Sequence, residues 1–351
     1  MVQNKKILFL IDSLGSGGAQ RQIIHWANFL LEQNNEVELA IYHDDIFYKN
    51  LNKKIIIHKL NSKQFYRILD WFKLINKIKP NNVISFLTIP NLMNISSSIF
   101  FDYNCIISER SHKILSSWIV KKTCSLFYKI PNKLVVNSIT SRSFFKKYNK
   151  NVILIRNIIS VDDIKLKIEK KHTTMQVGVF ASHQFHKGLM KLVKSFSLLD
   201  NKLKEKIKIT WFGKDNYDKS KFFAKREIIN QNLSSFFIFK DAIDNVPSEM
   251  VKYDFIGLFS DFEGSPNVIA EAVSLGIPII MTDVSDCKYW LPKGNILTNH
   301  YTENISKALT RAYSTYKDLP KYYNISKSNK QITKKVFDSK IIYNNINLIL
   351  K

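Results

Sequence analysis

The sequence has few cysteines and no histidine pattern typical of a metal site, and these scarcities exclude some classes of protein. Its three cysteines, Cys105, Cys124 and Cys287, show neither metal-ligand spacing nor a paired disulfide framework. We expect them to be small buried side chains of a cytosolic protein. The eight histidines include no HxxxH pair. A resident metal ion is therefore not expected.

The sequence also lacks a long apolar run. A membrane-spanning helix needs about 20 apolar residues, and the best candidate, residues 82–101, is interrupted by Pro90, Asn91 and Asn94. The N-terminus resembles a signal peptide only superficially, because Asp12 breaks its apolar run and no small-residue cleavage site follows. We expect neither a membrane span nor a leader, and interpret residues 5–12 as a first strand.

Acidic residues are scarce relative to basic ones. The chain has 53 Lys and Arg against 29 Asp and Glu, a net charge of +24. Residues 1–171 contain 27 of these basic residues but only 12 of the acidic ones. Such an excess favours binding to phosphates, nucleic acids or anionic membranes, although a coding bias towards Lys, Asn and Ile would also produce it. Nucleic acid is the least favoured partner, because no helix-turn-helix, zinc or RNP-type pattern is present.

The order of apolar segments predicts two domains of class α/β. A length of 351 residues exceeds what one core usually serves, and alternating strands and helices are typical of parallel sheets with right-handed crossovers. We expect two doubly wound, Rossmann-like domains that face a ligand-binding cleft. The predicted divisions are a first domain over 1–157, a linker over 158–174, a second domain over 175–330 and a terminal helix over 331–351 that could pack back on the first domain. The predicted strands are residues 5–12, 37–42, 54–60, 81–87, 105–109, 133–138, 152–157, 176–182, 207–214, 236–241 and 253–260, followed by the apolar run before Thr282.

The most informative stretch is "DFEGSPNVIAEAVSLGIPIIMTD", residues 261–283. Ser265 is a good N-cap and Pro266 suits the first helical position. Gly276 is a natural residue to end a helix. The pattern predicts a strand, a glycine-containing turn, a helix from Pro266 to about Leu275, and a second buried strand.

This unit predicts a binding site for a diphosphate. Unpaired N–H groups and the helix dipole favour an anion at a helix N-terminus. Ligands of open α/β sheets also lie beyond the carboxyl ends of the strands. Glu263, before the helix, and Glu271, within it, would hold hydroxyl-bearing groups on either side of the diphosphate. The alternative is two solvated carboxylates that the helix dipole alone favours.

The motifs of this chain resemble those of a known family. Over its whole length it is similar to retaining glycosyltransferases of the GT-B architecture, family 4, of the type that assembles bacterial polysaccharides and O-antigen. "EGSPNVIAEAVSLGIPIIMTD" resembles the most specific motif of that family. "SLGSGGAQR" (13–21) and "HKGLMKLVKSFSLL" (186–199) resemble two weaker motifs in the expected order.

The resemblance implies roles for individual residues. Glu263 would bind hydroxyls of the donor sugar, Lys187 would neutralise charge on the leaving diphosphate, and Glu271 would bind the ribose. Ser182 stands where the family usually has an arginine, which puts full activation of the diphosphate in doubt; His183 or His186 could supply part of that charge if protonated. The other residues expected to bind the donor are Gly264, Ser265, Pro266, Asn267, Gly17 and Lys240.

The first half would hold the acceptor. The residues expected in the acceptor site or the cleft are Gly18, Gln20, Arg21, Glu109 and Arg110. The alternative for the glycines is that they only form a tight turn. The alternative for Glu109 and Arg110 is that they form a structural ion pair. Residues 111–133 mix apolar side chains with five lysines, which suits a helix lying on anionic lipid or one packed on its own sheet.

The resemblance implies a metal-independent enzyme that uses a nucleoside diphosphate sugar, such as a UDP-sugar or UDP-HexNAc. Its acceptor would be a lipid-linked saccharide in the synthesis of O-antigen, capsule or a glycoprotein glycan. We expect a cytoplasmic protein, peripheral at the inner face of the cell membrane. A non-catalytic sugar-nucleotide-binding subunit is the alternative. A Rossmann dehydrogenase is disfavoured because Gln20 replaces the last glycine of GxGxxG and Arg21 is not acidic.

Overall fold

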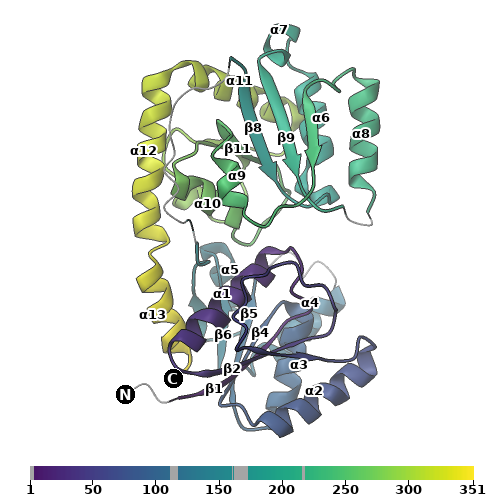
Figure 1. Ribbon diagram of the computed structural model, residues 1–351, viewed down its shortest axis with the longest axis vertical. Coiled ribbons are helices and arrows are strands. Elements are labelled where there is room, and N and C mark those ends of the chain that lie inside the picture. Colours follow the sequence, from purple (N-terminus) through teal and green to yellow (C-terminus); the bar gives the residue numbers. More distant parts are fainter. Residues whose placement is uncertain (1–3, 111–117, 160, 162–172, 216–217) are drawn as a thin grey trace. The chain divides into compact units, whose positions relative to one another are not determined.

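The computed structural model describes residues 4–110, 118–159, 161, 173–215 and 218–351. It divides the chain into two compact units (Figure 1). Unit 1 comprises residues 1–158 and 339–351, and unit 2 comprises residues 159–338. Each unit contains one parallel sheet flanked by helices. The predicted α/β class with two Rossmann-like sheets is confirmed.

The sheet of unit 1 has seven parallel strands in the order β3-β2-β1-β4-β5-β6-β7. The strand order reverses between β1 and β4, which is where ligands bind in doubly wound folds. Almost every residue of the central strands is buried, as expected for strands covered on both faces. The strands are β1 Lys6–Leu10, β2 Glu36–Ile41, β3 Ile56–Lys59, β4 Asn82–Phe86, β5 Asn104–Glu109, β6 Lys133–Val136 and β7 Val152–Leu154.

Helices cover both faces of this sheet. One face packs against α1 and α13 through residues such as Trp26 and Ile346. On the other face, α2 contributes Trp71 and Ile75, and α5 contributes Phe145. The helices of unit 1 are α1 Gly18–Glu32, α2 Gln64–Ile78, α3 Thr88–Ser98, α4 Trp118–Phe127, α5 Ile139–Phe145 and α13 Ser339–Ile349.

The sheet of unit 2 has six parallel strands in the order β10-β9-β8-β11-β12-β13. Its strand order therefore reverses between β8 and β11. The strands are β8 Met175–Phe180, β9 Ile207–Phe212, β10 Phe237–Lys240, β11 Phe255–Leu258, β12 Ile279–Thr282 and β13 Ile296–Thr298. All but β13 were predicted from the sequence.

Two helical layers enclose the sheet of unit 2. One face packs against α6, α8 and α11, for example through Phe196, Ile228 and Leu309. The other face packs against α9 and α10, with Phe337 at the end of α12. The helices are α6 Leu189–Ser197, α7 Asn201–Lys204, α8 Ser220–Asn230, α9 Val246–Met250, α10 Asn267–Leu275, α11 Thr302–Lys317 and α12 Leu319–Val336.

The predicted start of α10 is wrong by one residue. Pro266 is the N-cap, with extended backbone, and the helix begins at Asn267. The fixed φ of proline is compatible both with extended backbone and with the first position of a helix, so proline occurs as readily in either. Ser265 is therefore not the cap. The predicted end is correct: Gly276 has φ +84° and terminates the helix after Leu275.

The single helix expected over residues 331–351 is also wrong. Residues up to Val336 end α12, which belongs to unit 2, whereas α13 begins at Ser339 and belongs to unit 1. Phe337 leaves helical geometry (φ −118°, ψ 33°) and stacks edge-on against Trp290, with ring centroids 5.1 Å apart. Burial of this ring outweighs one further helical hydrogen bond.

Some expectations lie outside the described residues. Of the predicted linker, residue 160 and residues 162–172 are not described. Of the predicted interfacial segment, residues 111–117 are not described, and α4 occupies Trp118–Phe127. Within the described ranges, no helix combines the length and the apolar character needed to cross a bilayer.

Asn329 of α12 should stabilise unit 2 measurably. It is fully buried; its Nδ2 donates to Ile277 O (2.9 Å), and its Oδ1 accepts from Asn295 Nδ2 (2.7 Å). Asn329→Ala should lower the free energy of unfolding by about 1–3 kcal/mol, because it leaves buried polar groups unpaired. Urea denaturation measures this. Asn324→Ala, at an exposed position of the same helix, is the control, and an equal effect in both variants would contradict the assignment.

Candidate functional site

Two loops of unit 2 meet at the point where the strand order reverses. One follows β8 and the other follows β11, which are neighbouring parallel strands. Asp261 N donates to His186 O at 2.7 Å, joining the loops through their backbones. Gly188 has φ +81°, and a Cβ there would lie 2.1 Å from Phe259 O. Only glycine permits this approach, so Gly188 fixes how closely the loops pack.

The loops place Lys187 against Glu263. Lys187 Nζ lies 2.8 Å from Glu263 Oε1, and Ser260 Oγ donates to the same oxygen at 2.7 Å. Both charged side chains are mostly buried, with exposed fractions of 20% and 15%. The structure thus brings together the two residues predicted to be catalytic, from positions 76 residues apart.

Further contacts around these loops were not predicted from the sequence. Lys191 pairs with Asp261, and His300 Nδ1 lies 3.7 Å from the same carboxylate. The His186 ring stacks on Phe262, with centroids 4.8 Å apart and planes 12° apart. No local pattern links these residues, because Gly188, with φ +81°, separates Lys187 from α6, the helix that contains Lys191.

The turn before α10 is shaped by hydroxyl groups of the following strand and loop. Thr282 Oγ1 donates to Ser260 O at 2.7 Å, and Ser285 Oγ donates to Gly264 O. Thr282 is fully buried. Its contact therefore holds the loop after β11 in place.

The amino end of α10 has the character of an anion site. In the described chain no side chain caps it, and its first turn holds no acidic residue. The turn of residues 264–267 therefore leads into backbone N–H groups and a helix dipole of positive sign. Glu271, the fifth residue of α10, is only 4% exposed. It lies along the helix axis from the turn by about 6 Å, at 1.5 Å per residue.

The histidines near Lys187 do not replace the missing arginine. Burial and, to a lesser extent, the Lys221 charge lower the pKa of His183 to about 4. Burial and the Lys187 charge also lower the pKa of His186. Both rings are thus neutral at pH 7, and the idea that they supply positive charge there is wrong. Ser182 Oγ lies 3.4 Å from Gln184 Oε1, to which it donates.

Lys240 is not close to the Lys187–Glu263 pair. It ends β10, the edge strand two positions from β8, which corresponds to about 10 Å across the sheet. Its Nζ lies 3.9 Å from Glu249 Oε1 and 5.2 Å from the centre of the Phe212 ring. A role for Lys240 would therefore concern a different part of an extended ligand.

In unit 1, the predicted glycine turn lies between β1 and α1. Gly17 is the N-cap of α1, and Gly18 and Arg21 lie in its first turn. Gln20 Nε2 donates to Asp12 Oδ1 at 3.0 Å, and a Cβ on Gly17 would lie 2.0 Å from Gln20 Oε1. Gln20 thus folds over the turn, and a side chain at position 17 would have to displace the end of the Gln20 side chain.

Glu109 and Arg110 are both buried where β5 ends, and each has partners of its own. Glu109 Oε1 accepts from Asn91 Nδ2 (3.0 Å) and from the Tyr128 hydroxyl. Burial raises the pKa of Glu109 to about 7 despite these bonds. Arg110 Nη1 donates to Asn157 Oδ1 at 3.1 Å. Both side chains thus have contacts beyond the simple Glu109–Arg110 ion pair that was the alternative interpretation.

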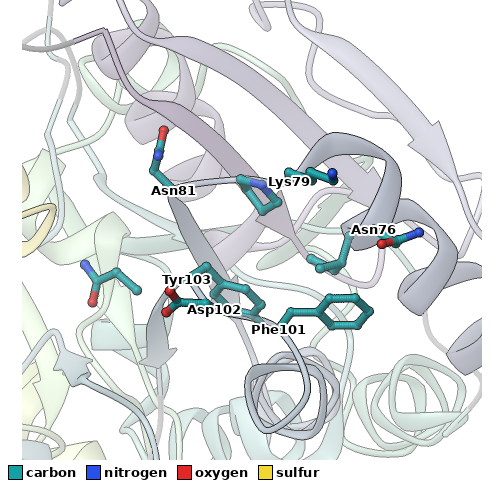
Figure 2. Close-up of a pocket in the computed structure, with 9 residues that line it drawn as sticks. Asn76, Lys79, Asn81, Phe101, Asp102 and Tyr103 are labelled. Atoms are coloured by element: carbon teal, nitrogen blue, oxygen red, sulfur yellow. The ribbon is translucent and has the colours of Figure 1, made fainter.

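A pocket of about 530 Å³ lies at the other edge of the same sheet (Figure 2). Its residues include Asn81 and Asn104, which precede or begin β4 and β5. This is the amino edge, whereas ligands of doubly wound sheets bind at the carboxyl edge. None of the predicted site residues lines this pocket. The described residues also contain no group of three His, Cys, Asp or Glu side chains placed to hold a metal ion.

A protein-family model and two known protein sequences match this chain. Residues 171–315 match the family model described as glycosyl transferases group 1. A Campylobacter jejuni protein is 25% identical over 287 residues, 76% of each chain. It is named GalNAc-alpha-(1->4)-GalNAc-alpha-(1->3)-diNAcBac-PP-undecaprenol alpha-1,4-N-acetyl-D-galactosaminyltransferase. An uncharacterized glycosyltransferase of Haemophilus influenzae is 22% identical over 316 residues, 80% of this chain and 81% of that protein.

Solved structures match over nearly the whole length. The crystal structure of Anabaena Alr3699/HepE in complex with UDP and glucose has a TM-score of 0.84 and 16% identity, covering 98% of both chains. WaaG, described as a glycosyltransferase involved in lipopolysaccharide biosynthesis, has a TM-score of 0.74 and 13% identity, again covering 98% of both. At such identities the likeness concerns the fold.

Glu109 should make the stability of unit 1 depend on pH. Its pKa in the fold is about 7, above the ordinary 4.5, so the stability present below pH 4.5 is lost as pH rises through 7. Glu109→Gln removes this loss. The variant should therefore gain about 3 kcal/mol over the parent protein between pH 4.5 and 8.

Urea denaturation at pH 4.5 and pH 8 measures the difference between the two proteins. Glu303→Gln, at an exposed position of α11, controls for a general effect of charge. A difference between Glu109→Gln and the parent that stays constant with pH would show that Glu109 does not titrate as proposed.

Proposed function

Because this chain is a glycosyltransferase with the GT-B fold, we propose that it moves a sugar from a nucleoside diphosphate sugar to a lipid-linked saccharide, with retention of the anomeric configuration. The family match covers much of unit 2, and unit 2 also contains the Lys187–Glu263 pair. The placement of that pair, at the strand reversal beside an uncapped helix N-terminus, is the observation that carries the proposal.

The donor would bind along the turn that leads into α10. The diphosphate would lie at residues 264–267, against the helix N-terminus, and would share the Lys187 ammonium with Glu263. Glu271 would accept hydrogen bonds from the ribose, and Glu263 from hydroxyls of the transferred sugar. The proposal uses the two carboxylates predicted from the sequence, Glu263 and Glu271. The structure adds that Ser260 donates a hydrogen bond to Glu263.

The reaction breaks the bond between the anomeric carbon and the diphosphate oxygen and forms one between that carbon and the acceptor oxygen. For retention, the acceptor hydroxyl approaches on the face from which the diphosphate leaves. The leaving phosphate oxygen can take the acceptor proton, so no separate base is required. Lys187 and the backbone N–H groups would stabilise the charge on the leaving group, each well-placed donor contributing about 3 kcal/mol.

A UDP-sugar is the favoured donor, and UDP-HexNAc in particular. The Anabaena structure contains UDP, and the Campylobacter protein is named as an N-acetylgalactosaminyltransferase. That name also specifies a saccharide joined through a diphosphate to undecaprenol. We therefore propose a lipid-linked acceptor for this chain too, bound by unit 1 at the cytoplasmic face of the membrane during synthesis of a bacterial surface glycan.

A second candidate function is supported by Ser182. The family usually has an arginine there, and neither neighbouring histidine is charged at pH 7. A protein with weak activation of the diphosphate could bind sugar nucleotides without transferring sugar. The purified protein, supplied with UDP-sugars and a lipid-linked saccharide, should release UDP if it is an enzyme. Binding without release of UDP would favour the non-catalytic role.

The proposed membrane contact involves the part of α4 that the structure describes and the turn after it. Leu126, Phe127 and Ile130 are 62%, 39% and 42% exposed, which is high for apolar side chains. Lys122 and Lys129 are exposed beside them. Apolar and basic side chains on one surface suit the interface of an anionic bilayer.

Glu271→Ala should weaken binding of the sugar nucleotide at least tenfold, because a hydrogen bond from ribose to a carboxylate is charge-assisted. Isothermal calorimetry with UDP measures the effect. Glu303→Ala removes a carboxylate from an exposed position of unit 2 and should leave affinity unchanged. If Glu271→Ala binds UDP as tightly as the parent protein, the ribose assignment is wrong.

Replacing Lys122 and Lys129 by Glu should weaken binding to anionic vesicles at least tenfold, since each cation near the surface contributes about 1 kcal/mol. Co-sedimentation with vesicles containing phosphatidylglycerol measures this. The matched control replaces Lys202 and Lys206, exposed in unit 2, and changes the net charge equally. The same loss in both variants, or in neither, would remove α4 as the contact surface.

A further inference from the structure

Arg110 has the bidentate edge of its guanidinium group unused within the described residues. Its Nη1 donates to Asn157 Oδ1, whereas Nε and Nη2 are buried and have no hydrogen-bond partner there. Nε and Nη2 lie on one edge of the planar group, and their two parallel N–H bonds match the two oxygens of a carboxylate or phosphate. The side chain as a whole is only 8% exposed.

The orientation of this edge is fixed by neighbouring residues. The guanidinium carbon lies 4.0 Å from the centre of the Phe86 ring and 5.5 Å from that of Trp26. Asn157 holds the opposite edge, and the next residue, Ile158, exchanges two hydrogen bonds with the side chain of Gln22, at 2.7 and 2.8 Å. Aromatic faces and a fixed amide thus leave the guanidinium group little freedom to turn.

Other unpaired polar atoms lie at the same edge of the sheet. Ser108 Oγ, Asn137 Oδ1 and Thr140 Oγ1 are buried without a partner in the described chain. Ser108 lies near the end of β5, and the other two follow the end of β6, the neighbouring strand. A folded protein leaves few buried polar atoms unpaired, and those that remain often mark a functional site. Their gathering at the carboxyl edge indicates a ligand there.

Burial of Arg110 is unfavourable without such a ligand. Removal from water lowers the pKa of its guanidinium group to about 9, only partly opposed by the charge of Glu109. The Glu109 carboxylate is itself engaged by Asn91 and Tyr128. An oxyanion on the free edge would compensate the buried charge, and hydrogen bonds between charged groups are strongest where water is excluded.

We propose that Arg110 binds an oxyanion carried by the acceptor, so that this glycosyltransferase selects acidic acceptors. The inference rests on the proposed function, because unit 1 is there assigned to the acceptor. Two sources present the same chemistry: a phosphate of the lipid diphosphate, or the carboxylate of an acidic sugar. Nε and Nη2 are covered in this structure, so the acceptor displaces the atoms above them as it binds.

Three variants test the proposal. Arg110→Met keeps the length and apolar stem of the side chain but removes the charge. Arg110→Lys keeps the charge but lacks the two parallel N–H bonds. Arg142→Gln, at an exposed position of α5, is the control for the loss of one positive charge from unit 1.

The probes are geranylgeranyl diphosphate, methyl glucuronide and inorganic phosphate, titrated by isothermal calorimetry into the full chain. We expect one of the two organic probes to bind the parent protein and Arg142→Gln equally, and both Arg110 variants at least tenfold more weakly. Preference for the diphosphate would identify the lipid phosphate, and preference for the glucuronide an acidic sugar. Equal affinity across all four proteins, or Arg110-dependent binding of inorganic phosphate alone, would overturn the proposal.

Thermal unfolding separates binding from a structural role. If the free edge serves a ligand, Arg110→Met removes an uncompensated buried charge and should unfold at an unchanged or higher temperature. A lower unfolding temperature together with unchanged probe binding would make Arg110 structural. UDP affinity is the second readout: it should be the same in all four proteins. Failure of the parent protein to bind UDP would instead contradict the proposed function.

Discussion

The ion pair between Lys187 and Glu263 is the contact on which the arrangement of unit 2 depends. It joins the loops after β8 and β11, and both side chains are mostly buried. Removing one partner would leave a charge in a poorly hydrated place, which costs far more than the pair itself contributes. The close approach at Gly188 and the backbone bond from Asp261 to His186 O hold the same loops together. Charge, backbone and glycine thus specify a single geometry.

This geometry explains why the missing arginine at Ser182 need not abolish the site. The positive potential at the strand reversal has two sources besides that position: the Lys187 ammonium and the amino end of α10. The second is a property of the backbone and does not depend on side chains. The neutral His186 contributes ring surface instead, since it stacks on Phe262. In the proposed mechanism, the loss of one cation would therefore weaken activation of the diphosphate rather than remove it.

The sequence predicted the strands and the α10 region well because both rest on local patterns. Buried parallel strands appear as apolar runs, and Gly276 ends a helix through its own backbone freedom. The errors arise from tertiary contacts. Residues 331–351 break into two helices because Phe337 packs on Trp290, 47 positions away. Likewise, no local pattern could reveal that Arg110 meets Asn157, or that Lys187 meets Glu263, because those contacts depend on the order of strands in the sheets.

The polar groups at the carboxyl edges of the two sheets fit the proposed roles of the two units in different ways. In unit 2 the charged groups at the strand reversal pair with one another, so the proposed donor would bind by exchanging partners with groups already held in place. At the carboxyl edge of unit 1, Arg110 and several hydroxyl and amide oxygens remain unpaired within the described residues. A backbone cradle recognises any diphosphate, whereas unpaired side chains at fixed positions accept only a ligand that complements them. Selectivity for the acceptor would therefore reside at this edge of unit 1, where a ligand that lacks the matching groups would leave buried polar atoms unsatisfied.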